Sequence, residues 1–81
     1  MYKNKNLDGS LNISGKKISE LRKSMLPKTS QKKLADMLQL EGLDLDKNAI
    51  QKIECGKRFI TDIELKVLAR ALHVSADWLL K

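Results

Sequence analysis

The amino-acid sequence predicts an all-α fold, a compact domain of five short helices. Apolar residues recur three and four positions apart, and capping residues or glycines stand where these stripes begin and end. The chain has 81 residues and a formal net charge of +6, so we expect one small domain, which we assign to residues 13–81. A chain of this length buries only ~60–65% of the surface that it exposes when unfolded, so its core must be well packed or completed by a partner.

The segment before this domain, residues 1–12, mixes Lys, Asn, Gly and Asp without periodicity. We interpret it as a flexible N-terminal arm. Basic arms can follow phosphates or enter a minor groove, but we favour a tail without such a role. Neither a secretion signal nor a run of about 18 apolar residues is found, so no membrane partner is predicted.

The central stretch of the chain predicts two short helices separated by a turn. Ser30 can cap the first helix, because its hydroxyl can accept a hydrogen bond from the free amides of the first turn. Leu34, Ala35 and Leu38 give this helix one apolar stripe, and Gly42 is a predicted helix stop.

The second helix of the stretch is predicted to begin after Asp46, whose charge suits the positive end of the helix dipole. Ile50 and Ile53 form its narrow buried stripe, and Gly56 ends it. The remaining face has long polar side chains and no bulky apolar group: Lys47, Asn48, Gln51 and Lys52. Such a face suits the edges of bases in a major groove, although it would also suit the solvated side of any amphipathic helix.

Three further helices are predicted around this stretch. One spans about residues 15–25 with Ser14 as its cap, and another opens with a capping box formed by Thr61 and Glu64. A last short helix follows Ser75 and ends in the bulky residues Trp78, Leu79 and Leu80. Any of these that stays exposed would be a natural dimer contact.

Several pieces of the chain form a specific combination: SQKKLA, AIQKIECGKR, LKVLARALHVS and WLL. Together they resemble the DNA-binding domain of Cro and phage-repressor type regulators, also called the xenobiotic-response-element family, over roughly residues 15–80. The resemblance implies five short helices, of which the second and third form a helix-turn-helix. The turn over residues 39–46 is longer than the family's usual turn, and we expect one or two of its leucines to cover the core.

The resemblance also implies which residues contact DNA. Those expected to reach base edges are Lys47, Asn48 and Lys52, with Gln51 as a weaker candidate. The resemblance implies phosphate contacts from Gln31, Lys57 and Arg58, and the position of Lys32 at a helix N-terminus adds Lys32 to this set.

The resemblance also implies an interaction that stabilises the fold and does not contact DNA. The resemblance implies an ion pair between Arg22 and Glu54 that braces the first helix against the third.

Lys32 lies in the first turn of its helix, where a cation opposes the helix dipole unless a phosphate binds there. A solvated lysine costs little at such a position, so both interpretations stay open.

The sequence offers no basis for an enzyme. It has no His–carboxylate–nucleophile set, no glycine-rich phosphate loop and no cluster of metal-ligating residues, so we predict neither a cofactor nor a metal. The one cysteine, Cys55, fits a reducing cytoplasm, and His73 is expected to be structural.

We therefore predict a cytoplasmic, sequence-specific DNA-binding transcriptional regulator, a repressor that blocks polymerase by occupying a palindromic operator. It is expected to bind as a homodimer through its C-terminal region, including Trp78 and Leu80. The alternative is an antitoxin-like module, which would use the same fold to cover a toxin partner.

Overall fold

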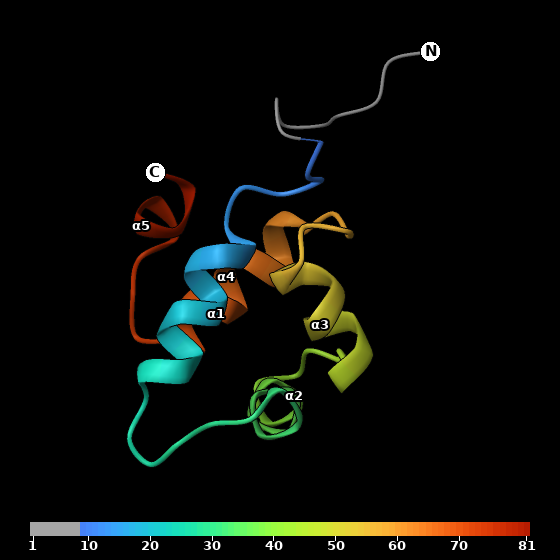
Figure 1. Cartoon of the computed structure of the whole chain (residues 1–81). Helices are drawn as coiled ribbons and strands as arrows, with labels where there is room; N and C mark the ends of the chain where they lie inside the picture. The colour runs from blue at the N-terminus through green and yellow to red at the C-terminus, as the bar shows by residue number, and fades with distance from the viewer. Residues whose placement is uncertain (1–8) are drawn as a thin grey trace.

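The computed structural model describes residues 9–81, and in this part of the chain it contains five helices and no strand (Figure 1). In chain order the helices are α1 (Gly15–Ser24), α2 (Gln31–Leu40), α3 (Lys47–Glu54), α4 (Asp62–Ala71) and α5 (Ala76–Leu80). The predicted all-α class is therefore confirmed.

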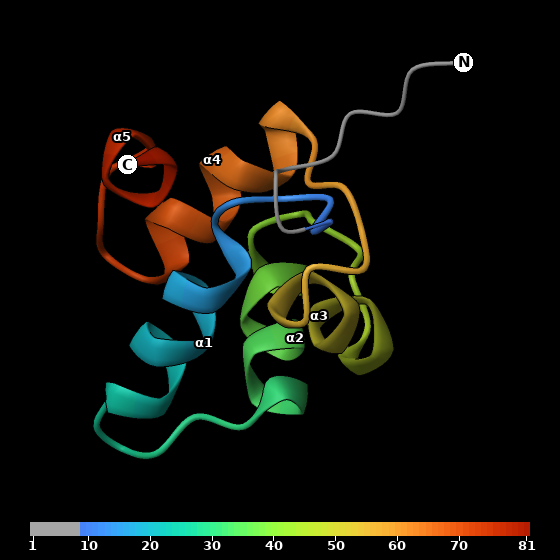
Figure 2. The same cartoon turned by 45° about the horizontal axis from the view of Figure 1, so that its top comes forward.

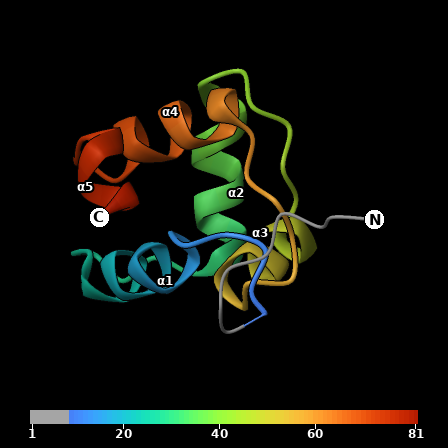
Figure 3. The ribbon, with the colours of Figure 1, turned by 90° about the horizontal axis from the view of Figure 1, so that it is seen from above.

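The helices α2 and α3 form the central pair of the fold, and the other three pack around them. α1 packs against α3, α4 packs against α2, and the short α5 packs against α4. Figure 3 shows α2 running from α4 at the top of the view down towards α1 and α3, and Figure 2 shows α1 to the left of α2 and α3. This arrangement leaves one side of α3 uncovered by any other helix.

The predicted apolar stripes form the core. Its fully buried hydrophobic side chains come from all five helices: Ile18, Leu34, Leu38, Ile50, Ile53, Leu68 and Leu79. Leu45, which lies in the connection between α2 and α3, is also buried, and Leu43 packs against the same core. Leu40 is exposed instead, so two of the three leucines of the long turn cover the core, as expected.

Three helices end in the same hydrogen-bonded turn, with one residue in the left-handed region. These residues are Gly42 (φ 86°), Gly56 (φ 76°) and His73 (φ 59°). In each turn the left-handed residue donates to the carbonyl three positions back, and the next residue donates to the carbonyl five positions back. Gly42 and Gly56 are thus the helix stops that the sequence predicted, and His73 has a structural role.

Four of the helices begin with a side-chain cap of the predicted kind. The capping oxygens belong to Ser30, Asp46, Thr61 and Ser75, and each accepts from the backbone amide three residues later. Ser14 stands at the N-cap position of α1, as predicted, but its side chain makes no capping hydrogen bond. Its hydroxyl is buried and donates to the carbonyl of Leu79 at 2.8 Å, which ties the start of α1 to α5.

The predicted flexible arm falls mostly on residues 1–8, which lie outside the described residues. Leu11 and Asn12, which were assigned to the same arm, are instead hydrogen-bonded to the helical body. The amide of Leu11 donates to the carbonyl of Gly56 at 2.8 Å, and the side chain of Asn12 bonds to α3 and to the loop after it. These two residues are therefore held against the helical body, which the sequence does not indicate because single hydrogen bonds across the fold leave no periodic signal.

The first turn of α1 approaches the end of α3 so closely that only glycine fits at residue 15. A Cβ atom built on Gly15 would overlap the carbonyl oxygen of Ile53 and come within 2.9 Å of Asn12 Oδ1. The obstacle is backbone, so it cannot move aside as the end of a flexible side chain can.

We expect Gly15→Ala to lower the free energy of unfolding by roughly 2–3 kcal/mol, because the new methyl group forces two backbone segments apart. Urea denaturation followed by circular dichroism would measure this loss. Lys16→Ala, at the exposed next position, is the control and should stay within about 0.5 kcal/mol of wild type. Equal stability of the two variants would contradict the close approach.

Candidate nucleic-acid interface

The exposed side of α3 carries all the residues predicted to reach base edges. Lys47, Asn48, Gln51 and Lys52 are exposed, and their spacing places them on the side opposite the buried Ile50 and Ile53. Within the described residues, neither Lys47 nor Lys52 takes part in an ion pair. The face therefore presents uncommitted donors and acceptors, as a surface that reads base edges requires.

The connection between α2 and α3 determines how this face is presented. The turn at Gly42 closes α2, and Leu43 and Leu45 then anchor the chain to the core before Asp46 begins α3. Asp46 Oδ1 accepts from the amide of Ala49 at 2.8 Å. The acid nearest the polar face is thus used as a cap, where its charge favours the helix dipole. The extra length of the turn is packed rather than loose.

The N-terminus of α2 is basic and has no acidic residue in its first turn. Lys32 is exposed and lies 3.4 Å from Asp36, in an ion pair whose side chains are 74% and 60% exposed. Such an exposed pair is weak and breaks easily. Lys32 can therefore turn to a phosphate placed at the free amides of this helix end.

Gln31 was predicted to contact a phosphate, and the structure also connects it to α3. Its side chain is half-buried, and Nε2 donates to Glu54 Oε1 at 3.1 Å. The amide keeps a second N–H for an external acceptor. Gln31 thus joins the N-terminus of α2 to the end of the polar helix α3.

The ion pair between Arg22 and Glu54 is present and bidentate. Arg22 Nε donates to Glu54 Oε2 at 2.7 Å and Nη2 donates to Oε1 at 3.0 Å, while Nη1 donates to the carbonyl of Thr29 at 3.0 Å. The two side chains are only 11% and 6% exposed. The pair therefore holds α1, the link before α2, and α3 in one network.

The electrostatics of Glu54 follow from this network. Burial alone would raise the pKa of Glu54, but the hydrogen bonds from Arg22 and Gln31 outweigh it and leave the pKa below its ordinary value. The hydrogen bond to Glu54 in turn raises the pKa of Arg22. Both groups are charged at neutral pH, and each offsets the free-energy cost of burying the charge of the other.

Lys57 and Arg58, the two cations of the loop after α3, are in different situations. Lys57 is exposed, whereas Arg58 makes two hydrogen bonds of 2.9 Å to the carboxylate of Glu64. The hydrogen bond from Arg58 lowers the pKa of Glu64, which also accepts from the amide of Thr61 in the capping box of α4. Arg58 therefore fastens the loop to α4, a role that the sequence prediction missed.

The sequence contains only part of the information that would predict the contact between Arg58 and Glu64. Glu64 was recognised as a capping-box residue, which uses one carboxylate oxygen and leaves the other for a second donor. No periodicity marks Arg58 as that donor. Within the described residues, no group of three or more His, Cys, Asp or Glu side chains could hold a metal ion, and none of the helices is long and apolar enough to cross a membrane.

Comparison with known families identifies the class of this fold. A helix-turn-helix family model matches residues 18–79, which is more than half of the chain. The chain therefore belongs to the Cro and phage-repressor type helix-turn-helix family, the xenobiotic-response-element family, with α2 and α3 as its helix-turn-helix. This is a family of DNA-binding domains rather than of enzymes. Searches of curated proteins and of solved structures found no significant match.

We expect Arg22→Ala to cost about 3–5 kcal/mol of stability at pH 7, because it leaves the buried charge of Glu54 without its partner. The double variant Arg22→Met/Glu54→Leu removes both charges and should lose less stability than Arg22→Ala. Chemical denaturation of the three proteins measures the difference. A single variant as stable as wild type would contradict the bracing role.

The pH dependence of stability gives a second readout of this pair. The pKa of Glu54 is lowered on folding, so its contribution to stability is complete above the unfolded value of about 4.3 and is lost as the pH falls through the folded value. In Arg22→Ala the stranded carboxyl can be protonated instead. The stability gap between wild type and Arg22→Ala should therefore narrow as the pH is lowered from 7 towards 4.

Lys57 and Arg58 should affect DNA binding differently. Lys57→Gln should reduce the slope of the logarithm of affinity against the logarithm of salt concentration by about 0.9 for each protomer bound, the value of one lost phosphate contact. Arg58→Gln removes the same charge but should leave the slope nearly unchanged and lower the thermal stability, because Glu64 loses its partner. Equal slope changes for both variants would show that Arg58 leaves Glu64 to bind phosphate.

Proposed function

We propose that this protein is a sequence-specific DNA-binding transcriptional regulator that represses by occupying its operator. One observation carries the proposal: the exposed polar face of α3 lies beside two sources of positive charge, the N-terminus of α2 and Lys57. Base edges in the major groove need polar groups on a helix, and phosphates on either side need cations or free amides.

In the proposed complex α3 enters the major groove. Asn48 can make two hydrogen bonds to adenine, and Lys47 and Lys52 can donate to guanine O6 and N7, with Gln51 as a further contact. The phosphates are contacted by Gln31, Lys32 and Lys57. Arg58, which the family resemblance also implies as a phosphate contact, stays paired with Glu64. Six or so phosphate contacts would make the affinity fall by about 10³-fold between 50 and 200 mM salt.

The proposal includes a homodimer, because one domain of this size reads only a short site. Two copies related by a two-fold axis would read half-sites ~34 Å apart. The C-terminal region supports this arrangement, since Trp78 is 40% exposed and Leu80 is 49% exposed, and Ile13 is exposed to a similar degree. Lys17 lies over the Trp78 ring at 5.3 Å and orders it for such a contact. The cytoplasm is the proposed location.

A second candidate function is an antitoxin-like module that binds a toxin partner. Leu40, at the end of α2, is 88% exposed and lies beside Met37 on a surface that neither DNA binding nor the proposed dimer uses. An exposed leucine of this kind is a natural anchor for another protein. Co-purification of a second small chain, lost in Leu40→Ser, would favour this alternative.

Selection of bound sequences from random duplex DNA at near-physiological salt tests the main proposal. We expect enrichment of a palindrome whose half-sites lie one helical turn apart. Asn48→Ala should then relax the preference at one base position by about tenfold, because a bidentate contact is lost. Lys66→Gln, on the exposed side of α4, is the control and should keep the selected sequence. If no sequence is enriched, the regulator proposal fails.

A further inference from the structure

We propose that Asn12 is a positioning residue for DNA reading, because it fixes the last turn of α3 and the loop after it to the start of α1. This inference rests on the proposed function and extends it to a residue outside the helix-turn-helix. Asn12 lies before the first helix, and it touches neither the polar face of α3 nor Lys57; its contact with Arg58 is to the backbone carbonyl.

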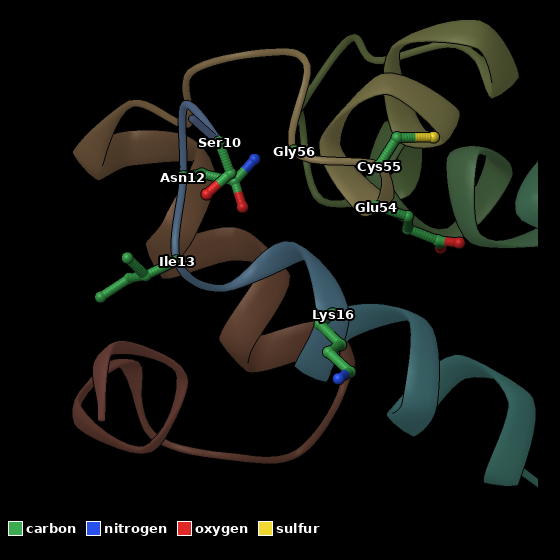
Figure 4. Close-up of a pocket in the computed structure, with 7 residues that line it drawn as sticks. All are labelled: Ser10, Asn12, Ile13, Lys16, Glu54, Cys55 and Gly56. Atoms are coloured by element: carbon green, nitrogen blue, oxygen red, sulfur yellow. The ribbon is translucent and has the colours of Figure 1, made fainter. Parts of the chain in front are cut away.

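Both the amide nitrogen and the amide oxygen of the Asn12 side chain form hydrogen bonds. Its Nδ2 donates to the carbonyl of Ile53 at 3.0 Å and to the carbonyl of Arg58 at 2.8 Å. Its Oδ1 accepts from the amide of Gly15 at 2.7 Å, which satisfies a free donor at the start of α1. In Figure 4 Asn12 and Ser10 lie on the Gly56 side of α3, whereas the side chain of Cys55 points away from them.

These contacts act on the two parts of the proposed interface at once. The carbonyl of Ile53 belongs to the last turn of α3, and the carbonyl of Arg58 belongs to the loop that carries Lys57. The hydrogen bond from the amide of Leu11 to the carbonyl of Gly56 adds a third link between the same segments. The N-terminal segment therefore holds the end of α3 and the Lys57 loop in one fixed relation.

The close approach at Gly15 makes this relation rigid. Gly15 and Asn12 meet the same carbonyl of Ile53, one through backbone contact and the other through a hydrogen bond. α3 has only 8 residues, so a shift of its last turn moves its whole polar face. Contacts to base edges tolerate such a shift poorly, because they need aligned donors and acceptors. Phosphate contacts from long lysine side chains tolerate it well.

Two variants separate the parts of this role. Asn12→Asp keeps the acceptor for the Gly15 amide and removes both donors, while Asn12→Ala removes all three hydrogen bonds. Lys66→Gln is the matched control, since it lowers the net charge by the same amount as Asn12→Asp from an exposed position on α4. Circular dichroism first establishes that each variant is folded.

We expect Asn12→Asp to lower the affinity for the selected duplex about tenfold relative to Lys66→Gln, the size of one weakened base contact. The affinity for a random duplex and the salt dependence should match those of the control. An equal loss on both duplexes, or an unchanged affinity for the selected duplex, would overturn the positioning role.

Amide hydrogen exchange gives a readout without DNA. The amides of Gly56 and Lys57 close the turn at the end of α3, and they should exchange faster in Asn12→Asp. The amides of Gly42 and Leu43, in the equivalent turn of α2, serve as the internal reference and should not change. If the wild type selects no DNA sequence, the proposed function fails, and the exchange rates alone decide whether Asn12 holds the end of α3. Unchanged exchange rates of the Gly56 and Lys57 amides would contradict the proposal that Asn12 fixes the end of α3.

Discussion

The buried ion pair between Arg22 and Glu54 is the interaction on which the arrangement of the helix-turn-helix depends. A charge removed from water needs several hydrogen bonds, and here they come from three different segments. Arg22 is on α1, the accepting carbonyl of Thr29 is in the link, and Gln31 begins α2. Each segment can therefore move only if a buried charge loses a partner, which makes the position of α3 an energetic requirement of the fold.

The helix ends complement this constraint. The same left-handed turn closes α2, α3 and α4, and it satisfies the last carbonyls of each helix within the chain itself. The turn after α2 also returns Leu43 to the core, so the long connection to α3 is anchored at both ends. A longer turn than the family's usual one is thus accommodated by local hydrogen bonds and by burial, without loosening the contact between α2 and α3.

Most of the fold could be predicted from the sequence because its determinants are local. The caps at Ser30 and Asp46 and the stops at Gly42 and Gly56 each act within one helical turn, so their residue types show their roles. Two of the contacts that were missed join distant segments, whereas the missed pair between Arg58 and Glu64 is local. Ser14 bonds to Leu79 across the whole chain, and Asn12 bonds to two carbonyls more than forty residues away. A single polar residue carries no periodic signal, so such contacts were identified only in the folded structure.

Arginine and lysine side chains have different roles in this protein, and this difference affects which residues of the proposed interface can discriminate between bases. All three arginines face a glutamate: Arg22 and Arg58 make bidentate pairs, and Arg70 lies 3.9 Å from Glu41. A guanidinium engaged in this way cannot also read a guanine with its two parallel donors. The cations left on the proposed interface are lysines, which act as adaptable point charges and favour any phosphate backbone. In the proposed complex, discrimination between bases would therefore come mainly from the amide side chain of Asn48, with Gln51 as a further contact. Both depend on the position in which the rest of the fold holds α3.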